Sequence, residues 1–242
     1  MNGNWRHNAD GLADEKQREP QLGDFTPDIV CAQESLHPRE YFTAESGGVL
    51  KHCVHEFVSH GKWGSAIYSR MLPLEPVHLQ KFSGSVVGAK ILNPSADGQA
   101  RSAMIFSLHA PTSRSYVGVV NEILDEIRKV WDGQPLILAG DFNVTTAFRH
   151  PSEIETKNSK KECELLTRLR MDFGLVNAWQ TLNPNQNLPQ TLRWSTKPSV
   201  PYHCDAVFVS HHFVPQLISA RVESSGDWGK MSDHNPLLVD IA

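Results

Sequence analysis

The residues of this sequence with the clearest potential for chemistry are polar side chains at the ends of short apolar runs. His109 follows the run 103–108, and Asp141 follows 136–139 through Gly140. The complete set holds four carboxylates, an amide and two imidazoles: Glu34, Asp141, Asp205, Asp233, Asn143, His109 and His234. Because a rigid sheet holds its strand ends and loops in fixed positions, active sites commonly gather there. The pattern predicts a site at the edge of a sheet.

These side-chain types suit metal-assisted hydrolysis of a phosphate ester. Mg²⁺ takes oxygen ligands, typically one or two carboxylates, while it keeps waters and substrate phosphates. Glu34 follows the apolar run 28–33, and Asp205 opens the run 205–209, so both carboxylates stand beside predicted strands. The imidazoles can bond a phosphoryl oxygen or move a proton near neutral pH, and the amide can donate to developing negative charge.

Each piece also has a purely structural interpretation. Asp141 and Asn143 could make a turn after Gly140, since both side chains bond nearby backbone groups. Asp233 and His234 could lie in a surface loop before the last strand, and the other carboxylates could be helix caps or surface charges. The joint occurrence of all the pieces in one order favours a site, because turn chemistry does not predict it.

Short strands and two helices are predicted to position these residues. The strands cover 28–33, 65–68, 85–91, 103–108, 136–139, 205–209, 218–222 and 236–241. Apolar residues recur every three or four positions in 119–131 and 165–173, which predicts two amphipathic helices, the second ending at Gly174. Many strands with few interspersed helices indicate sheets covered by helices. We expect one domain over residues 1–242, with an atypical segment over 1–27.

The composition excludes several classes of protein. The chain has 242 residues, a formal net charge of −4, 40% hydrophobic and 21% charged residues, which are globular proportions. No apolar run approaches the ~18 residues of a membrane span. Four scattered cysteines and an N-terminus with no apolar stretch predict a cytoplasmic chain with reduced thiols. The mild acidity argues against a non-specific DNA binder but not against a nuclease, because a bound divalent metal adds local positive charge.

Two further clusters of polar residues are not predicted to form functional sites. The sequence His-Cys-Val-His at 52–55 lacks a second ligand pair at the spacing of a structural zinc site, and we predict a polar loop there. Lys157, Lys160 and Lys161 are interpreted as the solvated start of a helix.

Six motifs stand in one order along the chain. They are Gln33-Glu34, Gly64-Ser65-Ala66-Ile67-Tyr68-Ser69-Arg70, Leu108-His109-Ala110-Pro111, Gly140-Asp141-Phe142-Asn143, Asp205-Ala206-Val207-Phe208-Val209-Ser210 and Ser232-Asp233-His234-Asn235-Pro236. From Pro27 to the C-terminus the chain resembles the endonuclease/exonuclease/phosphatase superfamily, which includes pancreatic deoxyribonuclease-type enzymes and abasic-site endonucleases. The resemblance implies an α/β fold, a two-sheet sandwich flanked by helices, with the site at one edge of the sheets.

The resemblance also implies roles for the metal and water ligands. Glu34 matches the family's principal metal ligand, and Asp205 matches an acidic residue that supports the metal or the water. Asp141 and Asn143 match the pair that orients the attacking water and contacts the phosphate.

The remaining motif residues match the groups around the phosphate. Asp233 and His234 match a dyad in which the carboxylate orients the imidazole, and Asp233 is also a candidate metal ligand. His109 matches the histidine that hydrogen-bonds the phosphate in the deoxyribonuclease-like branch. Thr191 and Trp194 resemble the family's aromatic segment and are expected to shape the pocket.

The chain departs from the family pattern at its start. Family members open with an apolar strand that ends in a Trp-Asn-x-Asn-Gly-like motif, whose first Asn helps to hold the metal or phosphate. Met1-Asn2-Gly3 resembles the tail of this motif, and Asn2 is the nearest candidate for that role. We therefore expect the first strand to be missing.

The leading hypothesis is a phosphodiesterase that uses Mg²⁺ or Mn²⁺ to hydrolyse nucleic acid by in-line attack of water. Asp141 would orient or deprotonate the water, a role for which His234 is a rival. One alternative is a phosphatase of small molecules or inositol phosphates with the same core. Another is an inactive binding protein that lacks its first strand. We expect a monomer without membrane attachment.

Overall fold

The computed structural model of the chain describes residues 27–36, 52–59, 61–94, 100–112, 115–149, 158–194, 200–224 and 228–242. Most of the atypical N-terminal segment lies outside the described residues, and so do the candidate Asn2 and the expectation about the first strand.

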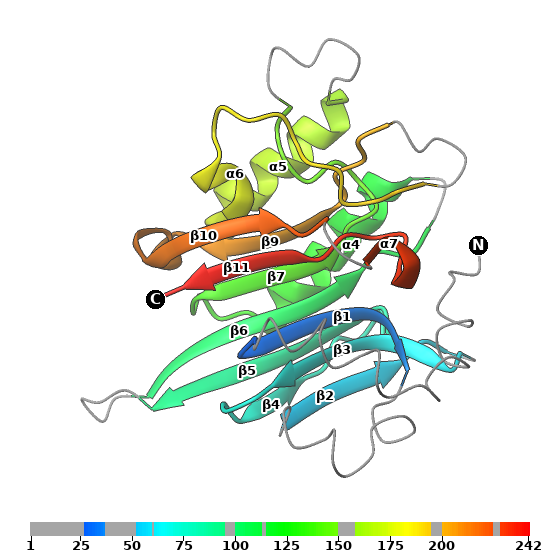
Figure 1. The fold of residues 1–242 in the computed structure, drawn as a ribbon. Coiled ribbons are helices and arrows are strands. Elements are labelled where there is room, and N and C mark those ends of the chain that lie inside the picture. The colour runs from blue at the N-terminus through cyan, green and yellow to red at the C-terminus, as the bar shows by residue number, and fades with distance from the viewer. Residues whose placement is uncertain are drawn as a thin grey trace.

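A six-stranded sheet runs through the centre of the molecule (Figure 1). In pairing order its strands are β4 (Leu74–Val77), β5 (Val86–Pro94), β6 (Ala100–His109), β7 (Leu136–Asp141), β9 (Asp205–Ser210) and β8 (Leu175–Asn177). Neighbouring strands are antiparallel except β6 and β7, which are parallel. A parallel pair needs a crossover connection, and the helix α4 (Tyr116–Val130) provides it.

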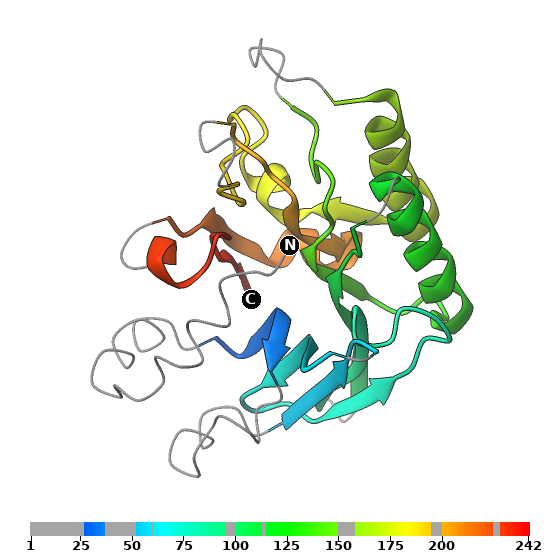
Figure 2. The ribbon, with the colours of Figure 1, turned by 90° about the vertical axis from the view of Figure 1, so that its right-hand side faces the viewer.

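A second layer of strands covers one face of this sheet, and helices cover the other (Figure 2). The layer consists of a three-stranded sheet in the order β1 (Ile29–Leu36), β3 (Trp63–Ser69) and β2 (His52–Phe57), and of the antiparallel pair β10 (Leu217–Val222) and β11 (Leu237–Ile241). The helical face carries α4 and α5 (Lys160–Phe173). The shorter elements are α6 (Ala178–Leu182), η4 (His211–Gln216) and α7 (Trp228–Met231). This arrangement confirms the predicted α/β fold of sheets flanked by helices.

The two long helices form where the apolar periodicity predicts them. The α4 side chains of Ile123, Leu124 and Ile127 are fully buried in one core cluster with Phe106 and Leu138 of the sheet. Burying one such side chain stabilises a fold by about 1.5–3 kcal/mol. The apolar face of α4 therefore holds the helix against the six-stranded sheet.

The ends of α5 are set by local chemistry. Ser159 and Glu162 form a capping box, in which the Ser159 hydroxyl accepts from the Glu162 N–H at 3.2 Å and the Glu162 carboxylate accepts from the Ser159 N–H at 2.7 Å. Gly174 ends the helix with φ +62°, as predicted. Lys160 and Lys161 lie exposed in the first turn, which confirms the solvated helix start for these two residues.

Four strands, β1, β2, β4 and β8, differ from the sequence predictions. Residues 52–55 form most of β2 rather than a polar loop, because Val54 is buried against the neighbouring sheet and the flanking residues alternate with it. The short strands β4 and β8 were not predicted; strands of this length have too few residues to show a period. Strand β1 continues past Gln33 to Leu36, so Glu34 lies within the strand rather than after it.

No helix in the described part of the chain is both long enough and apolar enough to span a bilayer.

Candidate active site

Three of the predicted site residues occupy one row of the six-stranded sheet. His109 ends β6, Asp141 ends β7, and Asp205 opens β9. In the sheet register, His109 is opposite Asp141, and Asp141 is opposite Asp205. Directly opposite residues point to the same face of a sheet, with Cβ atoms about 5 Å apart. Strand pairing alone therefore brings together side chains that are far apart in the sequence.

Gly140 allows the backbone to pack tightly just before this row. Its φ is +136°, and a Cβ there would lie 2.0 Å from the Leu108 carbonyl oxygen and 2.8 Å from Gln33 Nε2. Glycine is the residue that tolerates both the dihedral and the contact. Gln33 Nε2 also donates to Ser107 Oγ at 2.9 Å, which connects β1 to the six-stranded sheet directly beneath the site.

Asp141 is the buried centre of the row, with only 7% of its surface exposed. Its Oδ1 accepts the N–H of Asn143 at 2.8 Å. Its Oδ2 lies 3.9 Å from His109 Nε2 and 4.0 Å from His234 Nε2. Asn143 has φ +52°, and its Nδ2 donates to the Ala110 carbonyl at 2.8 Å. The loop after β7 therefore fixes one carboxylate between two imidazoles.

His234 reaches this row from the segment between α7 and β11. Its backbone forms an antiparallel bridge with Leu192, and the Arg193 N–H donates to the Asp233 carbonyl at 2.7 Å. The Arg193 guanidinium donates to the carbonyls of Ser232 and His234 and to Asn235 Oδ1. One arginine thus holds the whole turn that carries the imidazole.

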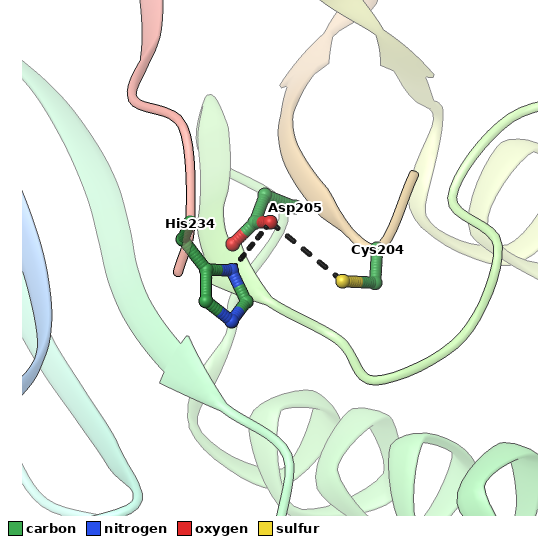
Figure 3. A group of neighbouring side chains, drawn as sticks. All are labelled: Cys204, Asp205 and His234. Carbon is green, nitrogen blue, oxygen red and sulfur yellow. Dashed lines mark hydrogen bonds and ion pairs between the residues drawn. The ribbon is translucent and has the colours of Figure 1, made fainter. Parts of the chain in front are cut away.

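The partner of His234 differs from the prediction. His234 Nδ1 lies 2.8 Å from Asp205 Oδ2 (Figure 3), so Asp205, and not its sequence neighbour Asp233, bonds the imidazole. The reason is geometric, because Asp205 stands in the row of the sheet opposite Asp141, and His234 Nε2 lies 4.0 Å from that same Asp141 carboxylate. Asp233 acts on His234 through its charge, which is the smallest of the named causes that raise the pKa of that imidazole.

The charges of the row depend on one another. Burial and then the Asp205 carboxylate raise the pKa of Asp141 to about 7. Burial and then the charge of His234 lower the pKa of His109 to about 4. Burial acts to lower the pKa of His234 as well, but Asp205 and Asp141 outweigh it and raise that pKa to about 9. Near neutral pH the row therefore combines a neutral His109, a protonated His234 and an Asp141 carboxyl that binds a proton more readily than an ordinary aspartate does.

Glu34 lies at an irregularity in β1. Ala32 is opposite Ala66 and Ser35 is opposite Gly64, so Gln33 and Glu34 together span one residue of β3, as in a β-bulge. Glu34 has φ +52°. Burial and then the Asp233 carboxylate raise its pKa, and His234 opposes this. Glu34, Asp233 and His234 therefore lie close enough to interact electrostatically.

Cys204 and Thr191 support the start of β9. The Cys204 thiol lies 3.7 Å from Asp205 Oδ2, on another side of that carboxylate from His234 (Figure 3). The Thr191 hydroxyl accepts the N–H of Cys204 at 3.0 Å and that of Asp205 at 3.1 Å. Trp194 instead packs edge to face against Tyr202, with 5.5 Å between the ring centroids. Thr191 is thus part of the site framework, whereas Trp194 contacts a neighbouring ring.

Sequence reasoning missed two residues of this site. Cys204 directly precedes the predicted Asp205, so its position was a usable signal. Arg193 carries no such signal, because nothing in the sequence relates it to a turn about forty residues later.

The site combines acidic and imidazole side chains at one edge of the six-stranded sheet, and a family model identifies the class of protein to which the chain belongs. The model of the Endonuclease/Exonuclease/phosphatase family matches residues 6–234, and the chain belongs to this family. Its members are phosphoesterase and nuclease enzymes that are generally dependent on divalent metals. No curated protein sequence matches the chain.

Solved structures share the fold over nearly the whole chain. An AP endonuclease from Archaeoglobus fulgidus is 18% identical with a TM-score of 0.65, covering 93% of this chain and 92% of its own. An AP endonuclease from Leishmania major is 15% identical with a TM-score of 0.67, covering 96% and 84%. The 3′ phosphatase NExo from Neisseria, bound to a product DNA hairpin, is 19% identical with a TM-score of 0.65, covering 95% and 94%. At these identities the likeness concerns the fold.

Proposed function

We propose that the protein is a divalent-metal-dependent phosphodiesterase that hydrolyses nucleic acid by in-line attack of water. The observation that carries this proposal is the row of His109, Asp141 and Asp205 with His234 at its side. It combines a proton acceptor with two imidazoles of opposite protonation state at one sheet edge, and such groups can accept the proton of an attacking water and donate hydrogen bonds to a phosphoryl group.

Glu34 and Asp233 are the proposed ligands of the cation. Their carboxylates repel each other, which contributes to the raised pKa of Glu34, so the pair carries negative charge that a dication would neutralise. Oxygen ligands of this kind suit Mg²⁺ and Mn²⁺. A bound cation would polarise a phosphoryl oxygen and stabilise its charge in the transition state. Asp205, a candidate metal ligand by sequence, is assigned here to orienting His234, because its Oδ2 bonds that imidazole.

Asp141 is the proposed acceptor of the water proton. A carboxylate whose pKa is raised to about 7 is a stronger base than an ordinary aspartate. His234 is a poorer candidate, because a pKa of about 9 leaves it protonated at neutral pH. In the proposed step the water oxygen bonds to phosphorus, its proton passes to Asp141, and the bond from phosphorus to the leaving oxygen breaks. Protonated His234 donates a hydrogen bond to the phosphoryl group.

Asn143 and His109 would complete the phosphate contacts. Asn143 Nδ2 uses one hydrogen for the Ala110 carbonyl, and its second hydrogen is available to a phosphoryl oxygen. His109, neutral because its pKa is lowered to about 4, has one N–H to donate.

The decisive experiment compares single-residue variants with a matched surface control. Hydrolysis of bis-p-nitrophenyl phosphate and of plasmid DNA is measured with Mg²⁺, with Mn²⁺ and with EDTA. Glu34→Ala and Asp141→Asn are expected to lose metal-dependent turnover. Glu164→Gln, on the exposed face of α5, is expected to keep it. Unchanged turnover in both site variants would reject the proposed mechanism.

Nucleic acid is the proposed substrate class because the neighbours of this fold include AP endonucleases and a 3′ phosphatase bound to DNA. One observation favours a second candidate, since the net charge of −4 gives no overall attraction to a polyanion. A small soluble phosphate ester would need no such overall attraction to reach the site. A panel of plasmid DNA, RNA and inositol phosphates separates the two, and hydrolysis of the soluble esters alone would reject the nuclease assignment.

A further inference from the structure

The side chains of Cys204, Asp205 and His234 form a cluster with the composition of a zinc site. One ligand atom from each can be chosen so that the three atoms lie within 4.8 Å of one another. Within the part of the chain that the structure describes, this is the one such group of three His, Cys, Asp or Glu residues. The proposed hydrolysis uses Asp205 and His234 but has no use for a thiol.

The distances in the cluster are close to those of a tetrahedral zinc centre. Bond lengths of about 2.3 Å to sulfur and about 2.0–2.1 Å to nitrogen or oxygen place tetrahedral ligand atoms roughly 3.3–3.6 Å apart. Cys204 Sγ lies 3.7 Å from Asp205 Oδ2, and His234 Nδ1 lies 2.8 Å from the same oxygen. A small separation of the imidazole from the carboxylate would accommodate the ion (Figure 3).

The charges around the cluster also favour a cation. Asp205 and Asp141 carry neighbouring carboxylates, and their proximity is one cause of the raised pKa of Asp141. Burial and the same carboxylates hold the Cys204 thiol protonated, but zinc displaces a thiol proton on coordination. Thiolate ligands select soft metals such as Zn²⁺, whereas carboxylates alone suit Mg²⁺.

We propose that Cys204, Asp205 and His234 form an inhibitory site for a thiophilic divalent cation of the Zn²⁺ class, distinct from the oxygen-ligand site at Glu34 and Asp233. Coordination through His234 Nδ1 and Asp205 Oδ2 releases the Nδ1 proton to solvent, ends the hydrogen bond between the two side chains and so removes the protonated imidazole from the reaction. The inhibitory consequence rests on the proposed hydrolytic function. The binding site itself does not.

The first test measures binding without substrate, with Cd²⁺ as the probe because its bond to a thiolate absorbs in the ultraviolet. The full chain is stripped with EDTA, exchanged into chelator-free buffer and titrated. The wild type and the control Cys163→Ser are expected to show a charge-transfer band that saturates with one bound ion, and Cys204→Ser is expected to lose it. His234→Asn, a second variant that keeps the thiol, is expected to weaken Cd²⁺ binding by about tenfold or more. A wild type without the band, or an unchanged band in Cys204→Ser, would overturn the proposal.

The second test measures inhibition by Zn²⁺ during Mg²⁺-dependent hydrolysis, with each variant normalised to its own rate without zinc. Cys204→Ser is expected to raise the half-inhibitory zinc concentration by about tenfold or more relative to the wild type and to Cys163→Ser. Together the two tests distinguish a failure of the proposed hydrolytic function from a failure of the proposed inhibitory site. Cd²⁺ binding at Cys204 in a protein without hydrolytic activity would reject the proposed function alone. Hydrolysis with equal zinc sensitivity in all three proteins would reject the inhibitory site alone.

Discussion

Replacing Asp205 by asparagine should uncouple His234 from the rest of the site. The pKa of His234 is raised from 6.5 to about 9 although burial acts to lower it, and the Asp205 carboxylate is the largest cause of the rise, both through its charge and through the 2.8 Å hydrogen bond. An amide keeps the size of the side chain but removes the charge. With burial then less strongly opposed, we expect the pKa of His234 in Asp205→Asn to fall from about 9 toward 6.5 or below.

The assay is an NMR titration of the imidazole carbon-bound protons of the protein in EDTA, so that no cation contributes to the shift. The alkaline limit of the variant's activity, measured with metal, should move to lower pH, because His234 then deprotonates at lower pH. The matched control is Asp233→Asn, which removes the sequence neighbour whose effect on His234 is the smallest of the named causes.

The two variants distinguish the observed partner from the one that the sequence predicts. If Asp233→Asn lowered the pKa of His234 as much as Asp205→Asn does, or if Asp205→Asn left it near 9, the assignment of Asp205 as the orienting carboxylate would be refuted.

Three further perturbations test the framework of the site. Gly140→Ala should lower the free energy of unfolding in urea by about 3 kcal/mol or more, because a Cβ there would lie 2.0 Å from the Leu108 carbonyl oxygen. A loss below about 1 kcal/mol, on the order of a surface substitution, would mean that the backbone relaxes around the new methyl group. In the folded protein, burial acts to raise the pKa of Glu162, but hydrogen bonds from Ser159 and Thr145 outweigh it and lower that pKa below its ordinary value of 4.5. Glu162→Gln should therefore be less stable than the wild type above pH 4.5, and the difference should vanish as pH falls through the pKa of the folded state. Thermal melts that show the same stability difference at every pH would contradict this. Arg193→Lys should lower kcat by up to about 100-fold with an unchanged circular dichroism spectrum, because a lysine cannot make the several hydrogen bonds of the planar guanidinium. A wild-type kcat would show that these hydrogen bonds are not needed to position the turn before β11.

The strand ends of the site were predictable, because apolar runs of four to six residues indicated β6, β7 and β9, and the polar site residues stand at the ends of these runs. The helices were equally accessible, since α4 has a long apolar period and α5 ends at Gly174. These features depend on local sequence alone.

The contacts between distant segments were not predictable. The choice of Asp205 over Asp233 as the partner of His234 depends on how the segment with His234 lies against the start of β9, which involves its bridge to Leu192 and the pairing of β9 with β7. The position of Glu34 depends on a bulge in β1, and no pattern of residues in the sequence indicates that bulge. The family motifs gave the residues of the site but not the contacts among them.

The single row that holds His109, Asp141 and Asp205 has a consequence for how the protein acquires activity. The row exists only when β6, β7 and β9 have all paired, and β9 comes from a distant part of the chain. A shift of β9 by one residue would turn Asp205 to the other face of the sheet. Closing such a long loop is a slow step in folding. A nascent or partly folded chain in which β9 has not paired therefore lacks this row, and we expect the proposed activity to return during refolding only once β9 has paired with β7.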